Sequence, residues 1–330
     1  MILLAHADEE RAVYYGEEAL AALRAVDEVR LNTSGRPLEG LALAAAAGGC
    51  SIIIGDIKSL ADSRLFENAP ELVAYVHGHV DARRVDVAAA SENGILVTHA
   101  SAGFGPAVAE LVVGFMIDLT RGITRSSLQW RAGGNPQTTT SSQLSSRTLG
   151  IIGYGHIGRH LARLARAMGM QVLVTDPYVE VEPGAGIEQV AFEHLLAKAD
   201  IVVPLAVATP ETANLIDAVA LARMKPTAFL INVSRGELVD EAALEQALDR
   251  HTIAGAALDV GLDAFRMPPP RLAARDDVLA TPHIGGVTPE ANHHQAMETV
   301  RQVAAILAGE IPPGAINADQ ATRLRARIGA

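Results

Sequence analysis

The sequence predicts an α/β protein of two domains, and three observations support this. From residue 148 onward, short apolar strand patterns alternate with helical patterns, as in a parallel sheet covered on both faces by helices. Residues 1–98 contain their own set of short apolar runs. The chain has 330 residues, more than one domain usually holds.

The first 98 residues resemble one small α/β unit. A helix is expected at 17–25, where Leu20 and Leu23 are apolar. Apolar runs predict four strands, at 1–5, 51–54, 72–76 and 94–98.

A long helix is expected next, at 106–121. It is apolar nearly all round, so it should be buried in a core or in a dimer interface. Residues 133–146 are rich in Gly, Ser, Thr and Asn and predict a surface loop.

Six strands are expected in the second half, with helical patterns such as 241–250 between them. Thr288, Pro289 and Glu290 start a final helix that runs to about residue 309, because they suit its cap, its first turn and its dipole. The six strands are expected at 148–152, 171–175, 201–205, 228–233, 254–259 and 278–281.

The segment 148–176 is the most informative part of the chain. Gly153, Gly155 and Gly158 have the G-x-G-x-x-G spacing of a dinucleotide-binding turn between a strand and a helix. Asp176 follows the next strand, where a carboxylate can bind ribose hydroxyls and would repel a 2′-phosphate. The pattern favours NAD over NADP. The alternative is a glycine-rich turn in another kind of α/β unit, which the flanking strand and helix patterns make less favourable.

Composition excludes several classes of function. A formal charge of −11 argues against binding to nucleic acid or to anionic membranes. Cys50 is the single cysteine, which fits a cytoplasmic protein without an intrachain disulfide. The N-terminus does not resemble a secretory signal, and no apolar stretch is long enough for a membrane span. No Cys/His spacing suggests a metal site.

Three segments follow predicted strands and carry chemically useful side chains: INVSRGELVDEAAL at 231–244, ALDVGLDAF at 257–265 and ATPHIGGVTPEA at 280–291. Ligands of open α/β sheets bind at the carboxyl edge. Arg235, Asp259 and His283 are therefore expected to converge on the cofactor cleft.

Together with GYGHIG, Asp176 and ENGILVTHAS at 92–101, these motifs resemble the D-isomer-specific 2-hydroxyacid dehydrogenase family, which includes phosphoglycerate and formate dehydrogenases. The resemblance covers nearly the whole chain. It implies a Rossmann-type NAD-binding domain at 100–287 and a smaller flavodoxin-like substrate domain at 1–99 plus 288–330, with catalysis between them. It also implies a homodimer, with helix 106–121 as its interface.

The implied activity is an NAD-dependent oxidoreductase acting on the CH–OH group of a small 2-hydroxy or 2-keto acid. Arg235 would bind the substrate carboxylate and His283 would be the acid/base. Taken singly, such an arginine is most often salt-bridged and a Thr-Pro-His segment is only a turn, but the full motif set favours catalysis. The residues expected to bind the cofactor are Gly153, Gly155, His156, Ile157, Gly158, Asp176, Val233, Ser234, Arg235, Asp259, His283 and Gly286, with Gly285 beside them.

The chain departs from the family at the partner of its histidine. Most members have a glutamate five residues after the Asp of the D-V motif, and here that position is Ala264. Asp263 is the candidate substitute. If no carboxylate reaches His283, its pKa should fall and activity should shift to lower pH or be modest.

The second departure is the substrate loop, VHGHVDARRVD at 76–86, where the family has a glycine-rich turn. Arg83 and Arg84 either supply charge for an anion or are surface residues at a helix start. Lys58 alone is too little for a phosphate site. Three histidines are expected on the surface: His160, His194 and His251. The roles of three others, near the cleft, stay open: His77, His79 and His99.

Two alternative functions remain. One is a weakly catalytic NAD-binding regulator of the same fold, which Ala264 and the altered loop allow and which retention of Arg235 and His283 opposes. The other is a biosynthetic phosphoglycerate dehydrogenase, without feedback control of the usual kind because no regulatory domain follows the last helix.

Overall fold

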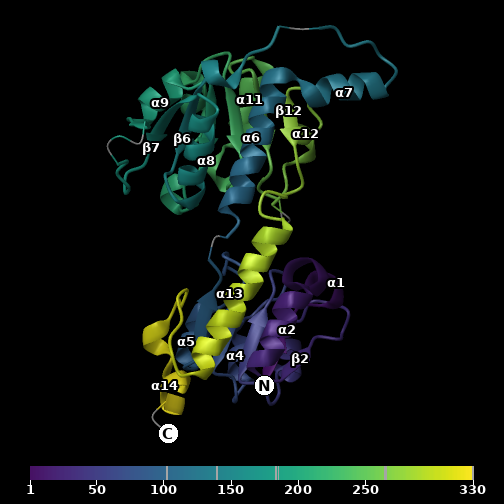
Figure 1. The fold of residues 1–330 in the computed structure, drawn as a ribbon, viewed down its shortest axis with the longest axis vertical. Coiled ribbons are helices and arrows are strands. Elements are labelled where there is room, and N and C mark those ends of the chain that lie inside the picture. Colours follow the sequence, from purple (N-terminus) through teal and green to yellow (C-terminus); the bar gives the residue numbers. More distant parts are fainter. Residues whose placement is uncertain (102, 139, 183, 185, 264–265, 329–330) are drawn as a thin grey trace. The chain divides into compact units, whose positions relative to one another are not determined.

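The computed structural model describes residues 1–101, 103–138, 140–182, 184, 186–263 and 266–328. The chain forms two compact units (Figure 1). Unit 1 consists of Met1–Gly103 and Pro289–Ala330, and unit 2 of Phe104–Thr288. The chain therefore passes from one unit to the other twice, and unit 1 is built from two separate stretches of sequence.

Unit 1 contains a five-stranded sheet in which every pairing is parallel, with the order β2-β1-β3-β4-β5. This is the strand order of flavodoxin-like sheets, whose switch point lies between β1 and β3. The strands are β1 (Ile2–Leu4), β2 (Val29–Leu31), β3 (Ile52–Gly55), β4 (Ala74–His77) and β5 (Leu96–His99).

Alternate strand residues of unit 1 feed two apolar cores, one on each face of the sheet. On one face, Leu3 and Ile53 pack under α3 (Gly40–Ala46), α4 (Ser63–Glu67) and α5 (Val87–Glu92). On the other, Leu4 and Ile54 pack under α2 (Gly16–Val26), α13 (Pro289–Leu307) and α14 (Thr322–Ile328). Short helices α1 (Asp8–Glu10), η1 (Arg11–Tyr15) and η5 (Ala318–Gln320) complete the unit.

Unit 2 contains a seven-stranded parallel sheet with the order β12-β11-β10-β9-β6-β7-β8. The direction of chain order reverses between β6 and β9, as in a Rossmann fold. The strands are β6 (Thr148–Ile152), β7 (Gln171–Thr175), β8 (Glu188–Gln189), β9 (Ile201–Pro204), β10 (Phe229–Asn232), β11 (Gly255–Leu258) and β12 (Val278–Ala280).

Helices also cover both faces of this sheet. One face carries α6 (Gly105–Arg121) and α8 (His156–Ala167), and the other carries α9 (Phe192–Lys198), α10 (Ala218–Arg223), α11 (Glu241–Asp249) and α12 (Pro270–Ala273). Helix α7 (Ile123–Arg131) projects from unit 2 and buries none of its residues (Figure 1). The short 3-10 helices are η2 (Leu144–Ser146), η3 (Pro210–Thr212) and η4 (Gly236–Leu238).

The predicted fold class is confirmed: the chain is an α/β protein with two parallel sheets. All ten expected strands are present, within two residues of their predicted ends. The edge strands β2 and β8 and the helix α7 were not predicted. Helix α6 is buried along only part of its surface, since Val112 and Met116 are in the core while Gly114 is exposed.

Candidate active site

The glycine turn of unit 2 lies at the switch point of the sheet, between β6 and β9. Gly153 has φ of 100°, and a Cβ there would lie 2.7 Å from the backbone N of Ala206. A Cβ on Gly158 would lie 2.4 Å from the carbonyl oxygen of Gly153. These two positions therefore require glycine, one for the turn and the other for close packing of α8 on it.

Gly155 differs from its two neighbours, because a Cβ there would have no atom within 4 Å. It is the N-cap of α8, and no side chain caps this helix end. The amides of His156 and Ile157 start the helix, where N–H groups and the helix dipole favour an anion. Open space in front of bare backbone is the geometry that a pyrophosphate requires.

Asp176 follows β7 and its carboxylate fixes this turn. Oδ2 accepts the N–H of Tyr154 at 2.7 Å, and Oδ1 accepts the N–H groups of Tyr178 and Val179 at 2.8 and 3.0 Å. Burial acts to raise the pKa of Asp176, but these three bonds and the nearby Arg159 lower it below its ordinary value. The carboxylate is therefore ionised and held beside the glycine turn, as a ribose-binding acid must be.

A second turn, after β10, positions Arg235. Asn232 is buried, accepts the Ser234 N–H at 3.2 Å and donates its side-chain amide to the Arg235 carbonyl at 2.9 Å. The Arg235 guanidinium donates to the Ser234 carbonyl at 2.8 Å. Val233 is buried. Asn232 was not among the predicted site residues, because its role depends on turn geometry that the residue type alone does not show.

Asp259 organises the segment that contains His283. It is 1% exposed; Oδ1 accepts the Thr281 hydroxyl at 2.6 Å and the Ile284 N–H at 2.8 Å, and Oδ2 accepts the Gly285 N–H at 2.8 Å. A Cβ on Gly285 would lie 2.9 Å from Oδ2, so glycine is favoured there. The same acid donates its backbone N–H to the Asn232 carbonyl at 2.9 Å, which links the histidine segment to the arginine turn.

His283 lies within the segment that Asp259 holds, and its φ is 57°, a left-handed conformation that non-glycine residues seldom adopt. Burial lowers the pKa of His283 below its ordinary value; Asp259 opposes this shift, and Arg235 and Arg266 add to it. Arg235, Asp259 and His283 are thus brought together in unit 2, close enough to influence one another electrostatically.

Asp263 does not behave as the predicted partner of His283. It is exposed, and its Oδ1 accepts the N–H of Met267 at 2.6 Å, which closes its own loop. Among the described residues, Asp259 is the acid that acts on the charge of His283. Ala264 lies outside the described residues.

In unit 1, the loop at 76–86 does not present glycine amides to a ligand in the expected way. The Gly78 N–H donates to the Gly55 carbonyl at 2.9 Å. His77 is fully buried and His79 is 9% exposed, whereas His99 is half-buried. Among the histidines expected at the surface, His194 and His251 are exposed, and His160 is half-buried.

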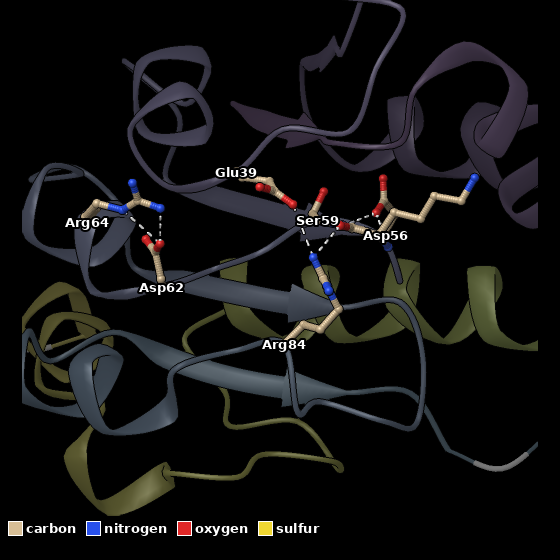
Figure 2. Close-up of polar contacts among 7 residues, drawn as sticks. Glu39, Asp56, Ser59, Asp62, Arg64 and Arg84 are labelled. Atoms are coloured by element: carbon tan, nitrogen blue, oxygen red, sulfur yellow. Dashed lines mark hydrogen bonds and ion pairs between the residues drawn. The ribbon is translucent and has the colours of Figure 1, made fainter. Parts of the chain in front are cut away.

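Three basic side chains around this loop each pair with an acid. Lys58 pairs with Glu10 at 2.6 Å, and Arg83 pairs with Asp81 at 2.9 Å. Figure 2 shows the Arg84 guanidinium directed towards Glu39, at 3.2 Å. The structure therefore favours the structural interpretation of these cations over an anion site.

Residues 113–285 match the model of the D-isomer specific 2-hydroxyacid dehydrogenase, NAD binding domain. The chain is also 36% identical over 272 residues to the glyoxylate reductase of Thermofilum pendens, covering 78% of each chain. The chain belongs to the D-isomer specific 2-hydroxyacid dehydrogenase family. Unit 2 carries the NAD-binding domain of that family, and the predictions of family and cofactor are confirmed.

Two further proteins are similar to the chain. The D-3-phosphoglycerate dehydrogenase of Synechocystis is 37% identical over 239 residues, which are 71% of this chain and 42% of the relative. The chain thus spans less than half of that enzyme. A D-lactate dehydrogenase with NAD+ from Lactobacillus jensenii has 26% identity and a TM-score of 0.81, over 96% of this chain and 99% of the other. Among the described residues, no helix has the length and apolar character to cross a bilayer.

Proposed function

We propose that the protein is an NAD-dependent D-2-hydroxyacid dehydrogenase, which also reduces the corresponding 2-keto acid. One observation carries the proposal: Asp259 and Asn232 hold the His283 segment and the Arg235 turn as one hydrogen-bonded assembly in unit 2. A purely structural pair of turns does not need a histidine in a left-handed conformation beside an arginine.

The glycine turn, the amides of His156 and Ile157, and Asp176 would hold the pyrophosphate and the adenosine ribose. Val233, Ser234, Asp259 and Gly286 would lie along the nicotinamide half. When bound, NADH supplies the hydride that reduces the substrate carbon. The space at Gly155 and the ionised Asp176 support this assignment.

Arg235 would bind the substrate carboxylate through two parallel N–H···O bonds and so orient the neighbouring keto group. His283 would donate a proton to the keto oxygen during reduction and accept it from the hydroxyl during oxidation. Asp259 would position His283 through the residues on either side of it, by accepting the Thr281 hydroxyl and the Ile284 N–H.

The protonation state of His283 affects the rates of reduction and oxidation differently. Because burial lowers its pKa, His283 is predominantly neutral at neutral pH and is ready to act as a base. Reduction needs the protonated ring, which becomes scarcer as pH rises. We therefore expect reduction to be favoured at acidic pH.

The test is NADH oxidation with glyoxylate, hydroxypyruvate, pyruvate and phenylpyruvate, for the natural chain and for Arg235→Lys and His283→Gln. Loss of at least 100-fold in kcat/KM in both variants, with NADH binding retained, supports the proposal. Arg235→Lys keeps the charge but loses two-pronged binding, so near-normal activity in that variant contradicts the carboxylate role.

The alternative is an NAD-binding regulator with little turnover, and the position of Asp263 favours it, because that carboxylate is engaged with Met267. Tight NADH binding without turnover on any of these acids, at pH 5.5 as well as at pH 7.5, would support the regulator.

We also propose a cytoplasmic homodimer formed through α6 and α7. Helix α7 exposes Ile123, Leu128 and Trp130, the last with 61% of its surface. Large apolar side chains exposed on one helix favour a partner surface. Light scattering should give twice the chain mass, and Leu128→Lys with Trp130→Lys should give a monomer; a natural chain that is monomeric at micromolar concentration contradicts the proposal.

A further inference from the structure

Helix α8 carries three arginines along one flank, in a chain whose formal charge is −11. Arg159, Arg163 and Arg166 are four and three residues apart, so they lie on the same face of the helix, and all three are exposed. Other arginines of unit 2, such as Arg271 and Arg275, pair with acids. Among the described residues, the three arginines of α8 form no ion pair, although the chain contains 38 acidic side chains.

The three arginines line a cavity of about 460 Å³, here called the arginine pocket. Its other lining residues are Tyr154, Ala167 on α8, and Ile187 on the segment that joins β7 to β8. Pockets that bind small molecules have volumes of about 300–1,000 Å³. The arginine pocket therefore has room for a small molecule, and it combines three cations with apolar side chains.

Both ends of the arginine pocket are positioned by the surrounding structure. The Arg159 guanidinium lies over the Tyr154 ring, 4.8 Å from its centroid. Tyr154 is buried, and its N–H donates to Asp176. The Arg166 guanidinium lies against Gly186, so closely that a Cβ at this glycine would collide with it. Because two of the guanidiniums are held before a ligand arrives, less side-chain entropy is lost when one binds.

The positive charge of the pocket is largely uncompensated. Arg163 donates to Nδ1 of His160 at 2.8 Å, and burial together with Arg163 lowers the pKa of His160, so this partner is neutral at physiological pH. Arg159 is close enough to Asp176 to lower the pKa of its carboxyl group, but both oxygens of that carboxylate accept backbone N–H groups. The pocket therefore favours an anion.

The spacing of the arginines indicates an elongated anion. Arg159 and Arg166 are seven residues apart, which separates their Cα atoms by about 10 Å along the helix axis. A ligand with two phosphoryl groups matches this length, since one group can bind Arg159 and the other Arg166. A guanidinium holds a phosphoryl group through two parallel N–H···O bonds, which a single point charge cannot do.

The arginine pocket is distinct from the dinucleotide site of unit 2. A dinucleotide lies across the carboxyl edge of the sheet, with its pyrophosphate at the helix N-terminus. Helix α8 starts at that edge with His156 and runs away from it, so Arg166 lies about 15 Å further along the axis. Only Arg159, beside Asp176, is near the cofactor, at the place where a 2′-phosphate on the adenosine ribose would lie.

We propose that the arginine pocket is a binding site for a small molecule with two phosphoryl groups, separate from the NAD site. Arg159 and Arg166 bind the two groups, and Arg163 contributes to both. Ala167 and Ile187 contact the part of the ligand between them. The site lies within unit 2 and uses neither Arg235 nor His283, so it does not depend on the dehydrogenase function.

Calorimetric titration tests the site in the full chain at 0.15 M NaCl, saturated with NADH so that the dinucleotide site is occupied. With pyrophosphate as the probe, we expect one site per chain with a Kd below about 1 mM, at least tenfold tighter than for inorganic phosphate. Arg163→Gln and Arg166→Gln should each weaken pyrophosphate binding at least tenfold, because each loses charge-assisted hydrogen bonds.

The exposed Arg250 provides the matched control, since Arg250→Gln should leave the Kd for pyrophosphate within twofold. All three variants change exposed side chains, so the melting temperature without pyrophosphate should stay nearly constant. Pyrophosphate should raise the melting temperature of the natural chain and not that of Arg166→Gln. Equal affinity for phosphate and pyrophosphate, no binding of pyrophosphate at about 5 mM, or an equal loss in Arg250→Gln would overturn the proposal.

The cofactor is the other source of a phosphoryl group near Arg159, and fluorescence titration with NADH and with NADPH distinguishes it. Arg163→Gln and Arg166→Gln should leave the Kd of both cofactors within twofold, because neither side chain reaches the dinucleotide. A tenfold loss of NADPH binding in these variants, or displacement of pyrophosphate by saturating NADH, would assign the arginines to the cofactor site and overturn a separate site. Pyrophosphate binding without turnover on any keto acid would keep this site and count against the dehydrogenase function alone.

Discussion

Mild acid should destabilise unit 1 through three buried histidines, His6, His77 and His79. His6, His77 and His79 have pKa values of about 3, 4 and 3 in the folded chain, against 6.5 when exposed. Between these values the unfolded chain binds protons that the folded chain does not, so the free energy of unfolding falls as pH falls. The stabilisation is present above pH 6.5 and is lost progressively below it.

The size of the effect follows from these shifts. Between pH 7.5 and pH 5.5, protonation of each histidine in the unfolded chain, where its pKa is near 6.5, lowers the free energy of unfolding by a little more than ~1 kcal/mol. The three together lower it by about 4 kcal/mol. That is a large share of the roughly 5–15 kcal/mol by which domains are stable. Glu10 and Asp81 act to raise the pKa values of His6 and His77, respectively, and are already included in these shifts.

The assay is urea unfolding at pH 7.5, 6.5 and 5.5, followed by circular dichroism, with hydrogen exchange of peptides from β1 and β4 to assign the transition to unit 1. His79→Gln removes one titrating ring, so its loss over this range should be about 3 kcal/mol instead of about 4. His194→Gln, at an exposed site, should retain the full loss. Stability of unit 1 that is constant down to pH 5.5, or the same loss in His79→Gln, would refute the reasoning.

Three further predictions concern unit 2. Gly158→Ala places a Cβ 2.4 Å from a carbonyl oxygen, so it should lower the free energy of unfolding by about 1–3 kcal/mol and weaken NADH binding in a fluorescence titration. Gly155→Ala places its Cβ near no other atom, so it should keep the melting temperature and weaken only NADH binding. An equal fall of the melting temperature in both variants would contradict this. Asp259→Asn removes the anion that raises the pKa of His283, so the pH profile of keto-acid reduction should move to lower pH, with kcat/KM reduced at least 100-fold. An unmoved pH profile would argue against this role of Asp259. Asp263→Asn should change kcat/KM less than threefold and leave that profile in place, since its carboxylate binds Met267, and a profile shifted towards acid would restore Asp263 as the partner of the histidine.

The parts of the fold that the sequence predicted are those with a buried apolar signal. Strands β6, β7 and β9 are continuous apolar runs because helices cover both sides of the sheet. Strand β2 was missed because Arg30 interrupts a three-residue edge strand. Helix α7 was missed because it buries no residue and so lacks the apolar stripe by which a helix is recognised.

The residues of the candidate site also divide into those that the sequence predicts and those that it does not. Gly153, Gly158 and Asp176 were predictable because their tasks are set by short-range spacing within one strand–turn–helix–strand segment. Asn232 was not, because its role depends on the turn in which it accepts the Ser234 N–H and donates to the Arg235 carbonyl. Asp263 was predicted to be the partner of His283 because it is next to Ala264 in the sequence, but its side chain closes a local loop by accepting the Met267 N–H.

The insertion of unit 2 within unit 1 has a consequence for the newly made chain. The strand residues Ile2, Ile54 and Val76 share an apolar core with Val300 and Val303 of α13. On the ribosome, at about 5–20 residues per second, the 185 residues from Phe104 to Thr288 take roughly 10–40 s to synthesise. During that interval this face of the first sheet has α2 but lacks α13 and α14. Unit 2 can complete its fold meanwhile, so the part that is made first is finished last, and its partly uncovered strands are where nascent chains would bind a chaperone or one another.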